Sequence, residues 1–258
     1  MLKPYNRADI EFSLGNEIGA EGKNSRVFLA HDRQLDAELV IKQVEKKGLD
    51  ATTFFAESSF AYAGSHSNVV PIHYACQDND FVYLAMPYYP KGSLKQLMAA
   101  RFLTPREIVR FATQFLNGVH HIHSKRLVHF DIKPGSILLS ERGEALVADF
   151  GLAKARGING LVEQDRTYGR MAPPETYKTD AFDQRFDVYQ AGLTLYRMCV
   201  GDSVFYAHFE SHFVNGQFDR HNFRHVVVNG QFPPTDADEF PEHIPDCIIK
   251  AIRKSVCD

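Results

Sequence analysis

The sequence has few of the features that mark secreted, membrane-bound or nucleic-acid-binding proteins. It contains only four cysteines in 258 residues and no C-x-x-C pair, which favours a reduced, intracellular and therefore cytoplasmic protein. It has no apolar run of 18 residues, and its first residues, MLKPYNRADIEF, lack the apolar core of a signal peptide, so we expect no membrane span. Its 29 basic and 32 acidic residues give a net charge of −3, which excludes a basic field that would attract nucleic acid.

The sequence is instead rich in apolar and aromatic residues. Hydrophobic residues make up 44% of the chain, including twenty Phe and eleven Tyr. This composition excludes a disordered or low-complexity chain. The length allows one large domain or two lobes with a substantial core.

The first third of the chain favours β-structure. Five β-rich runs are separated by Gly, Asp and Asn: IEFSLGNEIG, RVFLAHD, ELVIKQVE, VVPIHYACQ and DFVYLAMPYY. This pattern predicts short strands. One helix is predicted over residues 50–64, with Asp50 or Thr52 as its cap and Gly64 at its end.

From about residue 92 the apolar period becomes helical. Thr104-Pro105-Arg106-Glu107 is a capping box with proline at the first helical position. The apolar residues that follow are spaced by three or four and predict one buried face: Ile108, Phe111, Phe115, Val119 and Ile122. Residues 186–200, FDVYQAGLTLYRMCV, are apolar nearly all round and predict a buried helix. Strands followed by helices indicate an α+β fold in two lobes, with a cleft between them.

Two other patterns are assigned no function. VNGQF occurs at 214–218 and again at 228–232, and we interpret the copies as two turns because Asn-Gly is a common turn pair. Several histidines are close in sequence, but none lies in an H-E-x-x-H context or near a cysteine, which argues against a metal site: His120, His121, His123, His208, His212, His221 and His225.

Two motifs downstream of the capped helix carry recognisable chemistry. Residues 128–139 read VHFDIKPGSILL, and Asp149-Phe150-Gly151 ends the apolar run ALVADF eighteen residues after Asp131. In this order and spacing the sequence resembles the eukaryotic-type protein kinases over nearly its whole length, with the H-R-D-x-K-x-x-N loop matched at His129, Asp131 and Lys133. The resemblance implies a bilobal kinase fold, with a small β-rich N-lobe over about 10–87 and a larger, mainly helical C-lobe over about 88–258. It also implies a single domain over 1–258 that uses ATP and Mg²⁺, with Mn²⁺ as an alternative metal.

The resemblance assigns roles to three residues of these motifs. Asp149 is expected to hold Mg²⁺ that bridges the phosphates, next to a glycine that allows a sharp turn. Asp131 is expected to accept the proton of the substrate hydroxyl, and Lys133 to lie against the transferred phosphate.

The strand lobe supplies the expected nucleotide contacts. Leu39-Val40-Ile41-Lys42 resembles the V-A-I-K strand, so Lys42 is the expected partner of the α and β phosphates. Glu57 is the only Glu between residues 46 and 106, and it is the expected ion-pair partner of Lys42. The remaining expected contacts are apolar or come from the backbone: Val27, the gatekeeper Met86, and Tyr88 in the hinge.

The sequence departs from the family pattern at three places. The glycine-rich loop becomes Ala20-Glu21-Gly22-Lys23-Asn24-Ser25, leaving Gly22 and the early Gly19 to approach phosphate. Ser136 replaces the asparagine that ligates the second Mg²⁺, which predicts weaker binding of that ion. Phe130 replaces the arginine of the loop, a non-RD arrangement that lacks a basic pocket for an activation-segment phosphate.

The segment after D-F-G also resembles the family. Pro173-Pro174-Glu175 matches A-P-E with one extra proline, and Thr167 falls where a threonine bridges the catalytic Asp and Lys. Asp187 matches the aspartate that anchors the backbone of the catalytic loop. The family's last segment normally supplies an arginine for Glu175, and the sequence given stops before it. Either that segment follows, or Glu175 pairs elsewhere, for example across a homodimer.

These features predict a serine/threonine protein kinase that transfers the γ-phosphate of ATP to protein hydroxyls, with its own hydroxyls as further candidate acceptors. The serine/threonine preference rests on Lys133, Pro134 and Thr167. Two alternatives stay open. Ser136, Ala20 and Ser25 favour a pseudokinase that binds nucleotide or acts as a scaffold. A small-molecule kinase uses similar phosphate chemistry, although the run from Thr167 to Glu175 favours a protein substrate.

Overall fold

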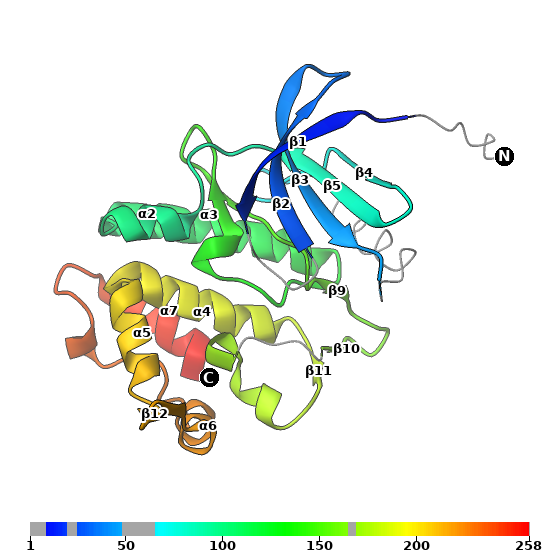
Figure 1. Ribbon diagram of the computed structural model, residues 1–258. Helices are drawn as coiled ribbons and strands as arrows, with labels where there is room; N and C mark the ends of the chain where they lie inside the picture. Colours follow the sequence, from blue (N-terminus) through cyan, green and yellow to red (C-terminus); the bar gives the residue numbers. More distant parts are fainter. Residues whose placement is uncertain (1–8, 20–24, 48–64, 165–168, 258) are drawn as a thin grey trace. The chain divides into compact units, whose positions relative to one another are not determined.

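The computed structural model describes residues 9–19, 25–47, 65–164 and 169–257, which form two compact units (Figure 1). Unit 1 takes the chain up to Ser65 together with Val70–Tyr88, and unit 2 comprises His66–Val69 and Tyr89–Asp258. The helix predicted over residues 50–64 lies outside the described residues.

Unit 1 contains a five-stranded antiparallel sheet of order β1-β2-β3-β5-β4. Its strands are β1 (Phe12–Gly19), β2 (Ser25–Asp32), β3 (Ala37–Glu45), β4 (Tyr74–Gln77) and β5 (Phe81–Pro87). The five predicted runs are therefore strands, but VVPIHYACQ forms one only from Tyr74. The prediction was too long because Pro71 has no amide hydrogen to donate, and because Val69 instead bridges Val147 of unit 2.

The pairing register gives the sheet two distinct faces. One face holds the apolar cluster of unit 1, built from Ala30, Leu39, Ile41, Tyr83 and Ala85. Residues opposite one another across antiparallel strands share a face. The register places Val27 opposite Lys42, Lys42 opposite Leu84, and Val40 opposite Met86. These residues therefore lie on the other face.

Unit 2 is mainly helical. Its α-helices are α2 (Leu94–Ala100), α3 (Pro105–Ser124), α4 (Arg185–Val200), α5 (Asp202–Glu210), α6 (Arg220–Val228) and α7 (Asp246–Cys257). Short two-stranded pairs join β6 (Leu127–Val128) to β9 (Lys154–Ala155), β7 (Ile137–Leu139) to β8 (Ala145–Val147), β10 (Val162–Glu163) to β11 (Ala181–Phe182), and β12 (Phe213–Val214) to β13 (Gln217–Phe218). Single 3-10 turns are η1 (Pro134–Ser136), η2 (Gly169–Met171), η3 (Pro174–Tyr177) and η4 (Ala237–Glu239).

The predicted start and buried face of α3 are confirmed. Thr104 and Glu107 form the reciprocal capping box, and Pro105 is the first helical residue. Bonds from Arg101 and Thr104 lower the pKa of Glu107 to about 2. The apolar stripe of this helix is buried from Ile108 to Ile122, which places α3 at the centre of the unit 2 core.

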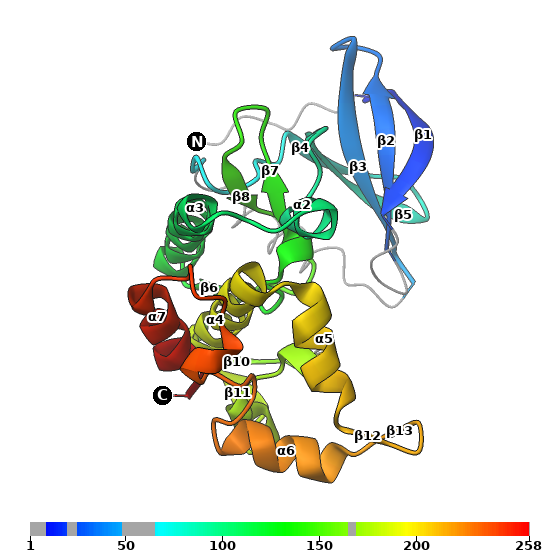
Figure 2. The ribbon, with the colours of Figure 1, turned by 90° about the vertical axis from the view of Figure 1, so that its left-hand side faces the viewer.

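The predicted buried helix is α4, which packs between α3 and α7 (Figure 2). Every residue from Phe186 to Val200 is buried except Val188. Glycine is needed at two helix contacts. A Cβ at Gly192 would overlap Ser255 of α7, and a Cβ at Gly118 of α3 would overlap the carbonyl of Asn68. Gly118 thus lets residues 66–69 lie directly against α3.

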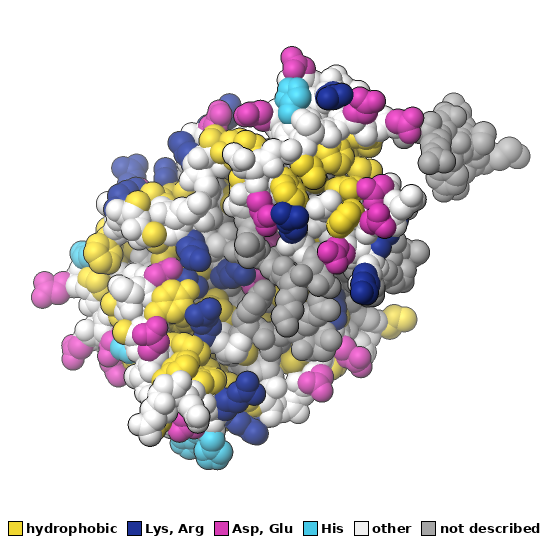
Figure 3. All heavy atoms as spheres, viewed as in Figure 1, with side chains coloured by type: hydrophobic (Ala, Val, Ile, Leu, Met, Phe, Trp, Pro, Cys, Tyr) yellow, Lys and Arg dark blue, Asp and Glu magenta, His cyan; other side chains and the backbone are white. Residues whose placement is uncertain are grey.

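Both copies of VNGQF contain turns, as predicted. The first is the β12–β13 hairpin, with positive φ at Asn215 and Gly216, and the second follows α6, with positive φ at Gly230. No helix among the described residues is long and apolar enough to cross a membrane. Basic and acidic side chains are mixed over the face seen in Figure 3, consistent with the small net charge of the chain.

Candidate active site

The backbone of the catalytic loop, residues 129–133, is anchored by Asp187 at the start of α4. Asp187 is fully buried, and its two carboxylate oxygens accept hydrogen bonds from the amides of His129 and Phe130, each at 2.8 Å. His123, at the end of α3, contacts the same carboxylate through Nε2 at 2.7 Å. The predicted anchoring role of Asp187 is confirmed, and His123 is a further participant that the motifs did not reveal.

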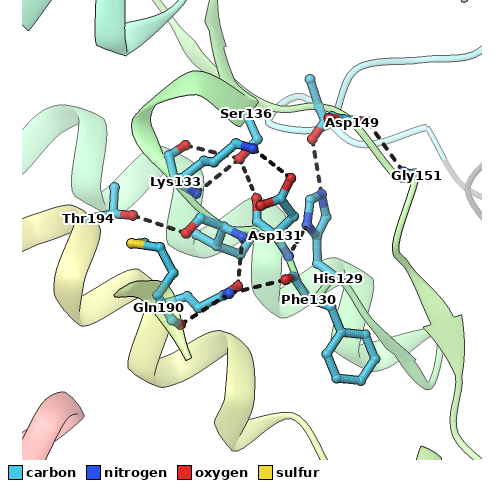
Figure 4. A network of polar contacts seen from close by, with 12 residues as sticks. His129, Phe130, Asp131, Lys133, Ser136, Asp149, Gly151, Gln190 and Thr194 are labelled. Carbon is cyan, nitrogen blue, oxygen red and sulfur yellow. Dashed lines mark hydrogen bonds and ion pairs between the residues drawn. The ribbon is translucent and has the colours of Figure 1, made fainter. Parts of the chain in front are cut away.

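Two more side chains of α4 bind the loop, as Figure 4 shows. Gln190 Oε1 accepts from the amide of Ile132 at 2.8 Å, and its Nε2 donates to the carbonyl of Phe130 at 3.1 Å. Thr194 donates to the carbonyl of Ile132 at 3.3 Å. Sequence reasoning missed both residues. The available signal was polar side chains at helical spacing, 187, 190 and 194, in a helix whose other buried residues, apart from Arg197, are apolar or aromatic.

The loop presents Asp131 beside Lys133. The side chain of Asp131 is 5% exposed, and one of its carboxylate oxygens lies 2.9 Å from Lys133 Nζ. Burial raises the pKa of Asp131, the positive charge of Lys133 opposes that rise, and the negative charge of Asp149 adds to it. The two aspartates are therefore close enough to interact electrostatically.

Ser136 braces the same loop from inside. Its hydroxyl lies 2.7 Å from the carbonyl of Asp131 and 3.0 Å from that of Lys133, and it accepts from the amide of Lys133 at 3.0 Å. A hydroxyl has one hydrogen and two lone pairs. The Ser136 hydroxyl uses its hydrogen to donate to the loop carbonyls, and one of its lone pairs accepts from the Lys133 amide. Its second lone pair is left.

The D-F-G segment is joined to the loop through His129. The amide of Asp131 donates to His129 Nδ1 at 3.3 Å, so the proton of the neutral ring lies on Nε2, which donates to the carbonyl of Ala148 at 3.0 Å. Phe150 packs its ring 5.1 Å from that of His129. The left-handed turn falls on Asp149 itself, with φ 63°, rather than on Gly151. Aspartate tolerates this conformation better than most residues.

Phe130, in the position of the family's arginine, also has a left-handed backbone, with φ 64°. Its side chain is 1% exposed. The ring lies 4.8 Å from Phe186 of α4 and 6.2 Å from Phe182 of β11, and the latter two rings are 5.2 Å apart. Phe130 therefore belongs to an apolar cluster of aromatic rings, at the position where the family has arginine.

In unit 1, the register aligns part of the expected nucleotide site. Gly19 on β1 is opposite Val27 on β2, which is opposite Lys42 on β3. Met86 lies on the same face as Lys42, two residues along β5 from Leu84, the partner of Lys42. Tyr88 follows that strand with 38% exposure. These five candidate residues lie in unit 1, whereas Asp131, Lys133, Ser136 and Asp149 lie in unit 2.

Three of the predicted site residues lie outside the described residues: Gly22, Glu57 and Thr167. Glu175 is described, in η3. Burial raises the pKa of its carboxyl group, and Arg185 opposes that rise. Arg185 itself is paired with Asp183 at 3.0 Å.

Comparison with known proteins agrees with this geometry. The family model described as a protein kinase domain matches residues 12–257. Rho-associated protein kinase 1 of Homo sapiens is 32% identical over 197 residues, which cover 73% of this chain and 14% of that protein. Serine/threonine-protein kinase PrkC of Bacillus subtilis is 29% identical over 191 residues, 71% of this chain and 29% of PrkC. Aurora kinase B-A of Xenopus laevis is 26% identical over 242 residues, 88% of this chain and 62% of that kinase.

The chain thus spans less than two thirds of the length of each of these relatives. The family match nevertheless covers nearly the whole chain and includes both the anchored catalytic loop and the D-F-G segment. The chain belongs to the protein kinase family.

Proposed function

We propose that this chain is a serine/threonine protein kinase that transfers the γ-phosphate of ATP to a protein hydroxyl. The observation that carries the proposal is the pairing of Asp131 with Lys133 at 2.9 Å on a loop anchored by Asp187. A buried carboxylate can accept the proton of an attacking hydroxyl, and a neighbouring ammonium can neutralise charge on the transferred phosphoryl group. The names of PrkC and other serine/threonine kinases among the relatives support the same activity.

The expected nucleotide contacts are part of this proposal. Lys42 would pair with the α and β phosphates, with Glu57 as its ion-pair partner. Gly19 and Gly22 would let the backbone approach the phosphates, while Val27 and Met86 would line the adenine site and Tyr88 would bind it through its backbone. The alignment of Gly19, Val27 and Lys42 across three strands supports their common role.

The oxygen donors of the loop and the D-F-G segment fit a magnesium ion. Mg²⁺ or Mn²⁺ bound there would neutralise phosphate charge. Asp149 is the principal ligand we propose, as its place in the D-F-G segment implies. Its negative charge raises the pKa of Asp131, so the two carboxylates lie near one another. Ser136 is the second, weaker ligand, because its hydroxyl is already bonded to the loop and keeps one lone pair.

We propose a non-RD kinase whose activity needs no phosphate on the activation segment. The position that would hold the phosphate-binding arginine is Phe130, buried in the cluster with Phe182 and Phe186. Phosphatase treatment before the assay should therefore leave the rate within about twofold of the untreated rate. A tenfold loss, restored by incubation with ATP, would contradict the proposal.

The remaining expectations concern the domain and its surroundings. We propose that residues 1–258 form a single kinase domain, with the N-lobe over about 10–87 and the C-lobe over about 88–258, in the reducing, ATP-rich cytoplasm. Limited proteolysis and cell fractionation test these two points. A homodimer that offers a partner to the half-buried Glu175 is tested by analytical ultracentrifugation, where a monomer at micromolar concentration would contradict it.

The central experiment measures phosphate incorporation from γ-labelled ATP with Mg²⁺ into a generic basic protein. Asp131→Ala should abolish incorporation while leaving nucleotide binding, because it removes the hydroxyl's acceptor and no phosphate ligand. Turnover unchanged in Asp131→Ala would contradict the assignment.

Two other outcomes identify the alternatives. Binding of nucleotide without turnover, in Mg²⁺ or Mn²⁺, would favour a pseudokinase, for which the replacement at Ser136 is the supporting observation. Turnover confined to small hydroxyl compounds would favour a small-molecule kinase.

A further inference from the structure

Gln190 holds the catalytic loop on both sides of Asp131. Its Oε1 accepts from the amide of Ile132 at 2.8 Å, and its Nε2 donates to the carbonyl of Phe130 at 3.1 Å. Those two residues flank Asp131 in the chain. A single side-chain amide therefore fixes the peptide planes before and after the candidate proton acceptor (Figure 4).

The orientation of this amide is determined by its neighbours. The Ile132 amide is a donor and can bond only to the oxygen of the Gln190 side chain, whereas the Phe130 carbonyl can bond only to its nitrogen. The reversed orientation would lose both bonds. Gln190 is 1% exposed, so neither the side chain nor its backbone partners could recover these bonds from bulk water.

The same amide also reaches the segment that precedes the A-P-E motif. Its nitrogen lies 3.4 Å from the carbonyl of Met171, at the end of η2. Nε2 has two hydrogens, so it can bond to Phe130 and Met171 at once. Gln190 thus joins the loop that carries Asp131 to η2, two elements that are about forty residues apart in the sequence.

The loop needs such support because its own side chains hold only part of its backbone, and because that backbone is strained. Ser136 reaches only the backbone of Asp131 and Lys133. Phe130 adopts a left-handed conformation, which is unfavourable for a bulky residue and persists only when its surroundings enforce it. Asp187 binds the amide of Phe130 and Gln190 its carbonyl, so both ends of this strained residue are held from α4.

We propose that Gln190 is a positioning residue for phosphoryl transfer. It sets the orientation of Asp131 relative to η2. This proposal rests on the proposed kinase activity. Asp131→Ala tests that activity separately, and the Gln190 variants are interpreted only against a wild type that turns over. Gln190 contacts neither ATP nor the reacting atoms in this role, so its loss should lower kcat and leave the KM for ATP nearly unchanged.

The first variant is Gln190→Met, which keeps the volume and removes both loop hydrogen bonds. We expect kcat to fall at least tenfold with the KM for ATP within twofold of wild type. The matched control is Leu195→Ala, a buried change on the same helix, about 140° around its axis from Gln190. The control should lose thermal stability but keep kcat within threefold at a temperature where both variants are folded. Equal losses of kcat in the two variants would overturn the proposal.

The second variant, Gln190→Glu, separates positioning from folding by its pH dependence. When ionised, the new carboxylate still accepts from Ile132 but repels the carbonyl of Phe130. When protonated, it regains one donor for that carbonyl. Burial and the negative charges of Asp131 and Asp187 disfavour the ionised form. Of the cations, Lys133 is paired with Asp131, and Arg197, which contacts Met171, is paired with Asp202. The ratio of its kcat to that of wild type should therefore rise several-fold as the pH falls, and a ratio independent of pH would overturn the proposal.

Discussion

The sheet of unit 1 and the catalytic loop of unit 2 hold their candidate residues in different ways. Lys42 lies on a strand paired on both sides, so backbone hydrogen bonds to β2 and β5 fix its position. Residues 129–133, all of them described, lie in no helix or strand. Their backbone is bonded instead to side chains, chiefly those of Asp187 and Gln190. Side chains that neighbour Lys42 in the sheet can therefore change without moving it, whereas the loop depends on a few polar groups.

The largest expected effect is that of Asp187→Ala. This change leaves the buried amides of His129 and Phe130, and the ring of His123, without their common acceptor. Unpaired buried polar groups are costly, so we expect a loss of about 3–5 kcal/mol in the free energy of unfolding. Urea denaturation followed by circular dichroism measures it.

The corresponding change in the sheet of unit 1 is Lys42→Met, which is compared with Asp187→Ala. Because backbone pairing with β2 and β5 holds β3 in place, the free energy of unfolding should change by about 1 kcal/mol or less, although kinase activity should be lost. A destabilisation by Lys42→Met as large as that by Asp187→Ala would break the comparison.

An intermediate effect is expected on the pH dependence of kcat, through Asp131 and Lys133 of the loop. Burial raises the pKa of Asp131, and Lys133 opposes the rise. Because the ionised carboxylate accepts the hydroxyl proton, kcat should fall as the pH falls through this pKa. Lys133→Met removes the opposing charge, raises the pKa further and should shift the acidic limb of the kcat profile to higher pH. Lys133→Arg keeps the charge and should leave the limb in place. A limb that moves to lower pH in Lys133→Met would refute this account of the site.

The smallest expected effect is that of Ser136→Asn, which tests the second metal site. Asparagine adds a longer oxygen donor, so the Mg²⁺ concentration for half-maximal activity should fall by about threefold or more, which corresponds to roughly 0.7 kcal/mol. The control is Ser140→Asn, in the turn after β7, where the serine bonds to Glu144. A rise in the required Mg²⁺ would mean that the brace within the loop, rather than metal binding, dominates at Ser136.

Much of this arrangement could be predicted from local sequence signals. The start of α3 follows from its capping box, and its buried face follows from the spacing of Ile108, Phe111 and Phe115. The order of the catalytic-loop and D-F-G motifs led to the family that the comparisons support. The extent of the β4 run was misjudged because its first residue, Val69, belongs to unit 2 and bridges Val147, next to the bond from Asn68 to Ala145. Composition does not reveal such long-range contacts.

The sequence by itself determined where helices begin, which faces are apolar and which residues are candidates for the chemistry, because capping, periodicity and short motifs involve residues only a few positions apart. Only the tertiary structure decided how the loop is held. Gln190 and Thr194 are polar interruptions of an apolar helix until folding brings them to backbone groups about sixty residues away. Buried peptide groups must find hydrogen-bond partners. Which distant side chains satisfy them depends on how α4 packs beside the loop.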